Sequence, residues 1–306
     1  MTAKRVLVSD PLSPRAIHML RAAPGLVIEE RKGLGEAELL PLVTDIDAWI
    51  VRGATKVTRR LLDAAPQLRW VARAGAGLDN IDVAAAKERG IDVLNVPGAN
   101  AVAVVELVFG LLLGVMRHIP VADASVHRGE WDKSKLMGRE LRGKTLGIVG
   151  LGKIGRGVAH RARAFEMTCI GCDPLIPDDA IRAMNVEPVA LDAMLPRADV
   201  LTLHVPLSAE TKGMISAERL AMLPRGAVLV NAARGGLVDE AALLAALNSG
   251  AIGGAALDVF ANEPPGDSAL ARHPRVVATP HIGAATVEAQ EAVGEEIVRL
   301  LLGRMG

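Results

Sequence analysis

The chain has 306 residues, half of them hydrophobic, and its 35 lysines and arginines balance its 35 aspartates and glutamates. This length allows about two domains with separate cores. The balanced charge argues against a nucleic-acid partner, because non-specific binding to a phosphate backbone needs a strongly basic surface. Residues 1–10 contain too short an apolar run for a secretory signal, so we expect a cytoplasmic protein.

Short apolar runs alternate with segments of helical composition through the first hundred residues. The runs are residues 6–8, 27–28, 48–51, 70–72 and 93–94. This alternation predicts βαβ units and therefore a parallel sheet. The apolar run Ala101–Met116 contains Glu106 and is shorter than the roughly 20 residues that span a bilayer. We therefore predict a buried helix there and no membrane partner.

A glycine-rich turn in the middle of the chain is the most informative motif. Residues 145–149 read as a strand, and the residues that follow it are Gly150, Leu151, Gly152, Lys153, Ile154 and Gly155. Gly150 suits a tight turn, Gly152 suits close approach of amide groups to a pyrophosphate, and Gly155 suits close packing of helix on strand. The alternative is a glycine-rich turn without a ligand. In this context the pattern predicts a dinucleotide site that includes Lys153 and Ile154.

An acidic residue, Asp173, comes 23 positions after Gly150, at the end of the next predicted strand. A carboxylate accepts hydrogen bonds from the ribose hydroxyls of NAD and repels the 2′-phosphate of NADP, so we predict NAD as the cofactor. Cys169 and Cys172 lie on the same predicted strand, where residues three apart face opposite sides. We interpret them as core residues rather than as a metal or redox site, and we predict no metal.

A second βαβ series has strands predicted at residues 145–149, 168–172, 200–203, 227–230, 255–257 and 276–278, and polar residues follow the last five of them. These residues are Asp173, His204 with Pro206, Arg234, Asp258 and His281. Ligands of open parallel sheets bind at the carboxyl ends of the strands. We therefore expect these side chains to converge in one crevice, with His204 and Pro206 lining the cofactor pocket or, alternatively, serving in ordinary packing.

Three of the side chains suit removal of a hydride from a carbon that carries a hydroxyl next to a carboxylate. His281 is the candidate base, because histidine has a near-neutral pKa in model peptides. Glu263 can orient the ring and favour its charged form. Arg234 can bind a substrate carboxylate with its planar fork. Taken singly, each also fits a structural interpretation as a loop, solvated or strand-capping residue.

The first domain has an anion-binding candidate of its own. The residues Arg73, Ala74, Gly75 and Ala76 follow a predicted strand and can present amide groups as a nest for a carboxylate. The alternative is a strand-to-helix turn capped by Asn80 or Asp82. Arg52 and Lys133 are candidates for neutralising a substrate phosphate, although basic residues are more often simply solvated.

Together these motifs resemble the D-isomer-specific 2-hydroxyacid dehydrogenases, with matching blocks at residues 51–58, 73–82, 143–156, 231–240, 255–265 and 280–286. The resemblance implies the catalytic roles of Arg234, Glu263 and His281, contact of Asp258 with nicotinamide, and a small 2-hydroxy or 2-keto acid substrate. It also implies a homodimer built around the Ala101 helix, with Lys133 reaching the neighbouring active site. We add Asn100 to the substrate-binding residues.

The resemblance also implies the architecture. We expect two doubly wound α/β domains with parallel sheets: a flavodoxin-like substrate-binding domain at residues 1–99 plus 283–306, and an inserted Rossmann NAD-binding domain at residues 100–282. Long family members carry a serine-binding regulatory domain. The chain ends at Gly306, which argues against serine feedback.

Within the family the chain is most similar to members that oxidise D-3-phosphoglycerate to 3-phosphohydroxypyruvate in serine biosynthesis. Reduction of glyoxylate, hydroxypyruvate or another 2-keto acid is the alternative. A more distant alternative is an NAD-sensing corepressor-like binding protein, for which we would expect negligible turnover.

Overall fold

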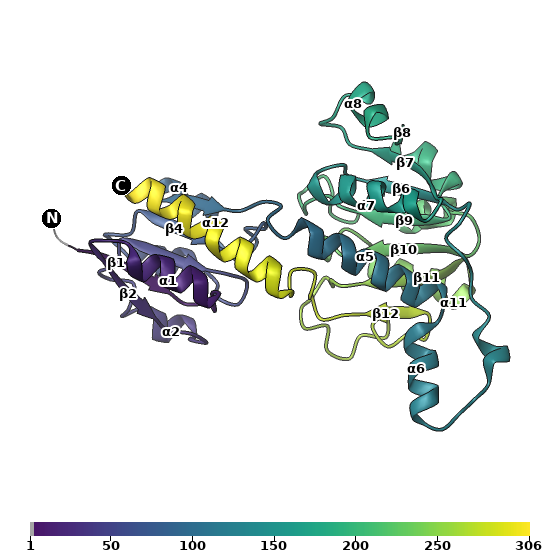
Figure 1. Cartoon of the computed structure of the whole chain (residues 1–306), viewed down its shortest axis with the longest axis horizontal. Helices are drawn as coiled ribbons and strands as arrows, with labels where there is room; N and C mark the ends of the chain where they lie inside the picture. Colours follow the sequence, from purple (N-terminus) through teal and green to yellow (C-terminus); the bar gives the residue numbers. More distant parts are fainter. Residues whose placement is uncertain (1–2) are drawn as a thin grey trace. The chain divides into compact units, whose positions relative to one another are not determined.

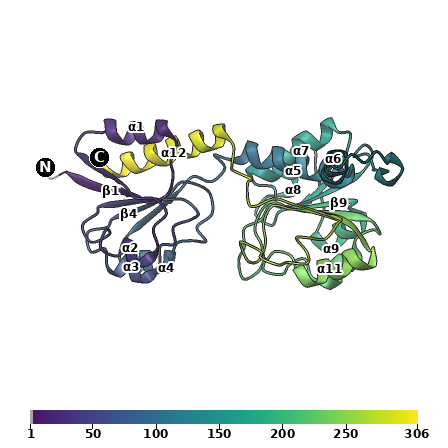
Figure 2. The ribbon, with the colours of Figure 1, turned by 90° about the horizontal axis from the view of Figure 1, so that it is seen from below.

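The structure is a computed structural model that describes residues 3–306, and the chain divides into two compact units (Figure 1). Unit 1 contains the described residues up to Asn100 together with Ala284–Gly306, and unit 2 is Ala101–Gly283. Each unit is a parallel sheet with helices on both faces, as Figure 2 shows. The predicted fold class is therefore confirmed.

Unit 1 contains a five-stranded sheet in the order β2-β1-β3-β4-β5, with all neighbours parallel. This is the flavodoxin-like order. The strands are β1 (Lys4–Val8), β2 (Leu26–Glu30), β3 (Ala48–Val51), β4 (Trp70–Arg73) and β5 (Asp92–Asn95). The helices are α1 (Pro14–Ala22), α2 (Glu36–Leu39), α3 (Arg59–Asp63), α4 (Val83–Glu88) and α12 (Val287–Met305).

Two apolar layers enclose the sheet of unit 1. Helices α1 and α12 cover one face and α2, α3 and α4 the other (Figure 2). The final helix packs through Val293, Ile297 and Leu301, which recur at helical spacing and are almost fully buried. The central strand β3 is buried at every position, as expected for a strand covered on both faces.

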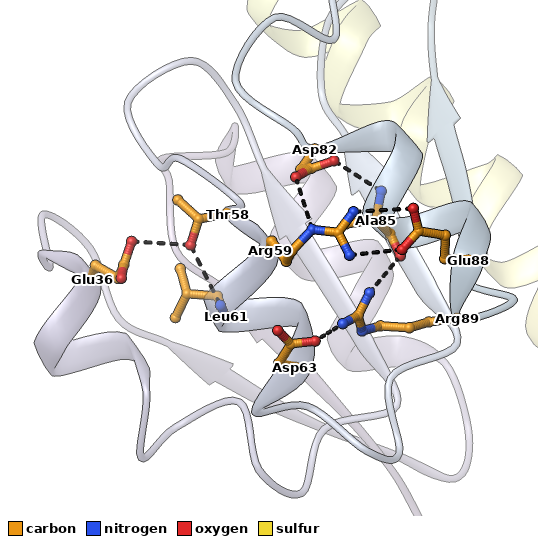
Figure 3. Close-up of polar contacts among 9 residues, drawn as sticks. All are labelled: Glu36, Thr58, Arg59, Leu61, Asp63, Asp82, Ala85, Glu88 and Arg89. Atoms are coloured by element: carbon orange, nitrogen blue, oxygen red, sulfur yellow. Dashed lines mark hydrogen bonds and ion pairs between the residues drawn. The ribbon is translucent and has the colours of Figure 1, made fainter.

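The outer face of α3 and α4 carries paired charges, drawn in Figure 3. Thr58 caps α3, and Asp82 caps α4 by accepting a hydrogen bond from the amide of Ala85 at 2.8 Å. Arg59 forms a two-pronged contact with Glu88 at 2.7 and 3.1 Å. These charges are exposed, so the network tethers two helix surfaces and contributes little to the stability of the core.

Unit 2 contains a seven-stranded parallel sheet in the order β12-β11-β10-β9-β6-β7-β8. Two strands, β7 and β8, lie on one side of β6 and four, β9 to β12, lie on the other, so the strand order reverses beside β6 as in a Rossmann fold. The strands are β6 (Thr145–Val149), β7 (Thr168–Cys172), β8 (Glu187–Pro188), β9 (Val200–Leu203), β10 (Ala227–Asn231), β11 (Ile252–Leu257) and β12 (Val276–Ala278). The helices are α5 (Ala101–Met116), α6 (Ile119–His127), α7 (Lys153–Ala164), α8 (Asp178–Ala183), α9 (Leu191–Met194), α10 (Ala217–Met222) and α11 (Glu240–Ser249), with 3-10 turns at Lys133–Leu136 and Leu195–Arg197.

The predicted buried helix is α5, which packs against α7 and one face of the sheet. Phe109 of α5 stacks on Phe165 with ring centroids 5.2 Å apart. The sequence indicated neither β8 nor α6, because the first is only two residues long and the second buries no side chain. Among residues 3–306 no single helix is long and apolar enough to cross a bilayer, whereas α5 and α6 together, bent by 67°, meet that test by length and composition.

The two cysteines occupy opposite faces of β7, as predicted. Cys169 belongs to the core beneath α5 and α7, and Cys172 packs against the core on the other face. Burial raises the pKa of each thiol to about 11. Both are free cysteines and remain protonated near neutral pH, which favours the packing interpretation over a redox role.

Candidate active site

The glycine turn of unit 2 has the geometry that a dinucleotide fingerprint requires. Gly150 has a φ of +90°, which L-residues rarely adopt, and ends β6 in a tight turn. A β-carbon at Gly155 would overlap the carbonyl oxygen of Gly150, so only glycine lets α7 approach so closely. A β-carbon at Gly152 would meet nothing within 4 Å. Gly152, Lys153 and Ile154 thus begin α7 with open space beside the first turn.

Asp173 lies half-buried beyond the end of β7, beside this turn. Its carboxylate accepts hydrogen bonds from the amide of Leu151 at 2.8 Å and from the amide of Leu175 at 3.0 Å. The acid therefore supports the glycine turn as well as being available to a ribose. This structural role was not evident from the sequence.

His204 lies directly under the glycine turn, after β9. Its amide donates to the carbonyl of Val149 at 2.7 Å, and its carbonyl oxygen faces Gly150. The ring Nε2 contacts the hydroxyl of Thr202 at 2.9 Å, while the buried Nδ1 has no partner among residues 3–306. Burial lowers the pKa of His204 to about 4, so the ring is neutral. Pro206 follows on the exposed continuation of the same loop.

The central pair of the site is His281 and Glu263. Nδ1 of His281 lies 2.7 Å from Oε2 of Glu263, and Oε1 of Glu263 accepts the amide of Phe260 at 3.2 Å. An ionised carboxylate can only accept, so the bond requires a proton on Nδ1. The second ring nitrogen, Nε2, is then the basic atom of a neutral imidazole. The two residues come from the segments after β11 and β12, which are neighbours in the sheet.

Asp258 fixes the loop that carries His281. It is almost fully buried, and its carboxylate accepts hydrogen bonds from the Thr279 hydroxyl at 2.7 Å, the Ile282 amide at 2.8 Å and the Gly283 amide at 2.9 Å. The amide of His281 donates to the Asp258 carbonyl at 2.9 Å. His281 itself has a φ of +54°, a left-handed conformation that a non-glycine residue adopts only when its surroundings impose it.

Arg234 stands on the loop after β10, and Asn231 shapes that loop. The Asn231 side chain donates to the Arg234 carbonyl at 2.9 Å and accepts the Ala233 amide at 3.1 Å. Nη1 of Arg234 donates to the Ala233 carbonyl at 2.7 Å. A β-carbon at Gly235 would overlap the backbone of Phe260, so the Arg234 loop packs directly on the segment that leads to Glu263.

A cavity of about 410 Å³ adjoins the histidine–glutamate pair, within the range usual for small-molecule sites. Its lining residues are Asp258, Phe260, Glu263, Pro264, Pro265, Ala271, Ala278, Thr279, Pro280 and His281. Most of these residues are apolar, and the side chains of His281 and Glu263 remain 48% and 38% exposed beside them.

In unit 1 the predicted nest occupies the end of β4. The amide of Ala74 donates to the Val51 carbonyl and that of Gly75 to the Arg73 carbonyl, both at 2.8 Å, so the protein uses these two donors itself. Gly75 has a φ of +152°, and a β-carbon there would overlap the Arg73 guanidinium. The Asn95 side chain donates to the Ala76 carbonyl at 2.6 Å and ties the segment to β5.

The remaining substrate candidates are spread over both units. Arg52 follows β3 in unit 1 and is half-buried. The cap of helix α4 is Asp82 and not Asn80. Asn100 is the last residue of unit 1, and its buried Oδ1 has no partner within the described chain. Lys133 is exposed on the 3-10 turn Lys133–Leu136 of unit 2. Among residues 3–306 no group of three or more His, Cys, Asp or Glu is placed to hold a metal.

The reversal of strand order beside β6, the glycine turn and Asp173 define unit 2 as a dinucleotide-binding α/β domain. Residues 109–283 match the family model described as D-isomer specific 2-hydroxyacid dehydrogenase, NAD binding domain. The chain belongs to the D-isomer specific 2-hydroxyacid dehydrogenase family. The predictions of the family and of NAD as the cofactor are confirmed.

Relatives and solved structures support the assignment over nearly the whole chain. The chain is 47% identical to D-3-phosphoglycerate dehydrogenase of Methanocaldococcus jannaschii, covering 98% of this chain and 58% of that protein. It is 45% identical to hydroxypyruvate reductase of Thermotoga maritima, covering 100% of both. The crystal structure of a glyoxylate reductase from Paecilomyes thermophila superposes with a TM-score of 0.88 at 32% identity, covering 98% of this chain and 95% of that one. The chain thus spans little more than half the length of the phosphoglycerate dehydrogenases it matches.

Proposed function

We propose that the protein is an NAD-dependent dehydrogenase that oxidises D-3-phosphoglycerate to 3-phosphohydroxypyruvate, a reaction of serine biosynthesis. The observation that carries the proposal is the 2.7 Å contact of His281 with Glu263, next to a cavity and in the same unit as the glycine turn. A base oriented by a carboxylate is what removal of a hydroxyl proton needs.

His281 is the proposed base. Its Nε2 takes the proton of the substrate hydroxyl, while Nδ1–H keeps its bond to Glu263. The negative charge of Glu263 stabilises the imidazolium that results. Asp258 holds the backbone of the His281 loop, so the ring does not have to be reoriented as the proton moves. In the reverse direction the imidazolium returns the proton to the oxygen.

The residues of the glycine turn fit the cofactor. The open space at Gly152 leaves room for a pyrophosphate at the start of α7, where amide groups point outward and the helix dipole favours an anion. Asp173 would hold the ribose hydroxyls, His204 and Pro206 would line the pocket, and Lys153 and Ile154 would contact the diphosphate. When NAD is bound, its nicotinamide would supply the acceptor for the hydride that leaves the carbon carrying the hydroxyl.

The substrate anions need basic and amide groups. Arg234 suits the carboxylate, because its loop is held against the segment of Glu263 and its guanidinium can form two parallel bonds. In unit 1 the amides of Ala76 and Gly77 are the proposed donors to a substrate anion, because those of Ala74 and Gly75 already donate within the protein. Arg52, Arg73 and Asn100 complete the proposed substrate residues of that unit.

The choice of D-3-phosphoglycerate rests on Arg52 and on the 47% identity to a D-3-phosphoglycerate dehydrogenase. Reduction of hydroxypyruvate or glyoxylate is the second candidate, favoured by the 45% identity to a hydroxypyruvate reductase over the full length of both chains. NADH absorbance with a panel of phosphorylated and unphosphorylated acids separates the two. Equal specificity constants for phosphorylated and unphosphorylated acids would reject the first.

We also propose a homodimer in which Lys133 serves the neighbouring subunit's site. Ile119 and Val126 of α6 are more than half exposed, and Trp131 is 87% exposed, so this segment presents apolar side chains that a second subunit could cover. Light scattering of purified protein tests the assembly. A monomer at micromolar concentration would contradict it.

A further inference from the structure

The loop Arg52–Gly53–Ala54–Thr55 in unit 1 is gripped by two side chains that occur far from it in sequence. Asp10, which follows β1, accepts hydrogen bonds from the amide of Arg52 at 2.5 Å and from the amide of Thr55 at 3.1 Å. Asn80 donates to the carbonyl of Arg52 at 2.8 Å and to the carbonyl of Thr55 at 2.6 Å. Asp10 therefore accepts from the N–H groups at both ends of the loop, and Asn80 donates to the C=O groups at both ends.

A chain of hydroxyls leads into the same carboxylate. The indole of Trp49 contacts Ser9 Oγ at 2.8 Å, Ser9 Oγ contacts Thr55 Oγ1 at 2.9 Å, and Thr55 Oγ1 donates to Asp10 Oδ1 at 3.0 Å. An indole can only donate and a carboxylate can only accept, so every hydroxyl in between has one direction. All four residues are almost fully buried. Both hydroxyls of this chain have a donor on one side and an acceptor on the other, and a buried network satisfied in this way favours a single conformation.

The side chain of Arg52 is left comparatively free by this arrangement. Its described hydrogen bond, from Nη1 to the carbonyl of Pro11, is long at 3.4 Å, and it forms no ion pair with a residue of the range 3–306. Partial burial lowers the pKa of the Arg52 guanidinium, an effect that the nearby Asp10 opposes. A guanidinium that loses water without gaining a carboxylate partner is ready to bind an anion.

We propose that Asp10 and Asn80 are positioning residues, which fix the backbone of Arg52 so that its guanidinium meets the phosphate of the substrate. This inference rests on the proposed function, because it assigns Arg52 to the phosphate of that substrate. Neither Asp10 nor Asn80 touches the ligand in this arrangement. Their effect should appear in binding of the phosphorylated acid and should depend on the presence of Arg52.

Calorimetric titration with 3-phosphoglycerate and with D-glycerate, in the presence of NADH, tests the inference. The variants are Asp10→Asn, Arg52→Ala and the double variant. Hydrogen bonds to a charged acceptor are worth enough for Asp10→Asn to weaken 3-phosphoglycerate binding about tenfold. Glycerate binding should change less than about twofold, and Asp10→Asn should add nothing measurable to Arg52→Ala.

Asp82→Asn is the matched control. Asp82 is also an aspartate of unit 1 that accepts a backbone amide at 2.8 Å, but it caps α4 within the surface network of Figure 3 and does not contact the Arg52 loop. Its binding constants should equal those of the wild type. If Asp10→Asn does not fold, Thr55→Val, which breaks the hydroxyl chain, and Thr55→Ser, which keeps it, make the same comparison.

Three outcomes overturn the inference: equal losses for both acids, full additivity with Arg52→Ala, or a wild type that binds 3-phosphoglycerate no better than glycerate. Turnover is measured separately. A wild type that prefers 3-phosphoglycerate in binding but does not oxidise it contradicts the proposed function, while an Arg52-dependent loss in Asp10→Asn still supports the positioning role.

Discussion

Two buried aspartates, Asp10 in unit 1 and Asp258 in unit 2, each hold a loop by hydrogen bonds, but the side chains that the two loops carry are held differently. Each follows a parallel strand and accepts hydrogen bonds from the loop after the neighbouring strand, β3 for Asp10 and β12 for Asp258. The loop held by Asp258 carries His281, whose ring is also bonded to Glu263. The loop held by Asp10 carries Arg52, whose guanidinium makes a long hydrogen bond of 3.4 Å to the carbonyl of Pro11 and no ion pair within residues 3–306.

The two loops are therefore suited to different steps of the reaction. In unit 2 both backbone and side chain are fixed before a ligand arrives, which suits a group that must transfer a proton at a defined angle. In unit 1 the backbone is fixed and the side-chain tip is left to the ligand, which suits recognition of an anion. Changes at the His281 loop should therefore affect kcat, and changes at the Arg52 loop should affect substrate binding.

The sharpest test of this contrast is His281→Asn beside Arg52→Ala. Loss of a general base lowers kcat by about 10² to 10⁴. We expect NADH affinity, measured by fluorescence titration, to remain within about twofold, because the ring is not needed to hold the cofactor. Arg52→Ala should instead raise KM for the phosphorylated acid with a nearly unchanged kcat. Unchanged turnover in His281→Asn would remove this residue as the base.

Glu263→Gln should have the next largest effect. Glutamine keeps the size of the side chain but loses the charge, and a hydrogen bond to a charged group contributes about 1.5–3 kcal/mol, or about 10- to 150-fold in kcat. The control is Glu240→Gln, since Glu240 accepts the amide of Ala261 at 2.6 Å in the same segment. Steady-state rates should fall only for Glu263→Gln. Equal losses in both variants would assign the effect to the segment and not to the charge beside His281.

Strand periodicity and glycine spacing predicted both parallel sheets and the strands that Asp173, Asp258 and His281 follow. Local patterns suffice for these features, because strands and a glycine turn are determined by neighbouring residues. The sequence did not indicate that Asp10 and Asn80 support the Arg52 loop, because Arg52 is 42 positions away from Asp10 and 28 from Asn80. Asn231 and the left-handed backbone of His281 likewise depend on contacts between segments that no local spacing records.

The buried ring of His204 in unit 2 should make the stability of the protein depend on pH. Burial lowers the pKa of His204 from its usual 6.5 to about 4. The unfolded chain binds a proton below pH 6.5 that the folded chain refuses, so stability falls between pH 6.5 and about 4. Each pKa unit is worth about 1.4 kcal/mol, and with part of the residue exposed we expect a loss of about 2 kcal/mol. Urea unfolding from pH 7.5 to 4.5 should show this loss in the wild type and a flatter profile in His204→Gln. Parallel profiles would mean that other groups cause the acid sensitivity.

A third aspartate at a strand end, Asp173, tests whether one carboxylate can combine support with ligand binding. It accepts two backbone amides but remains half-exposed, unlike Asp10 and Asp258. Asp173→Asn should weaken NAD binding about tenfold by removing charge-assisted bonds to the ribose. NADP binding should change less, because the repulsion of its 2′-phosphate disappears at the same time.

The control for Asp173→Asn is Asp199→Asn, measured by the same fluorescence titrations with both dinucleotides. Asp199 accepts the amide of Thr145 at 2.9 Å, at the opposite end of the strand β6 that leads into the glycine turn. Asp199 therefore supports the backbone as Asp173 does, but it does not lie next to the glycine turn. If Asp173→Asn lowered the affinities for NAD and NADP equally, Asp173 would act only as a support for the turn. The ribose would then be held by another group. A selective loss of NAD affinity would mean that Asp173 has two roles. It would support a loop, as Asp10 and Asp258 do, and it would also contact the ligand.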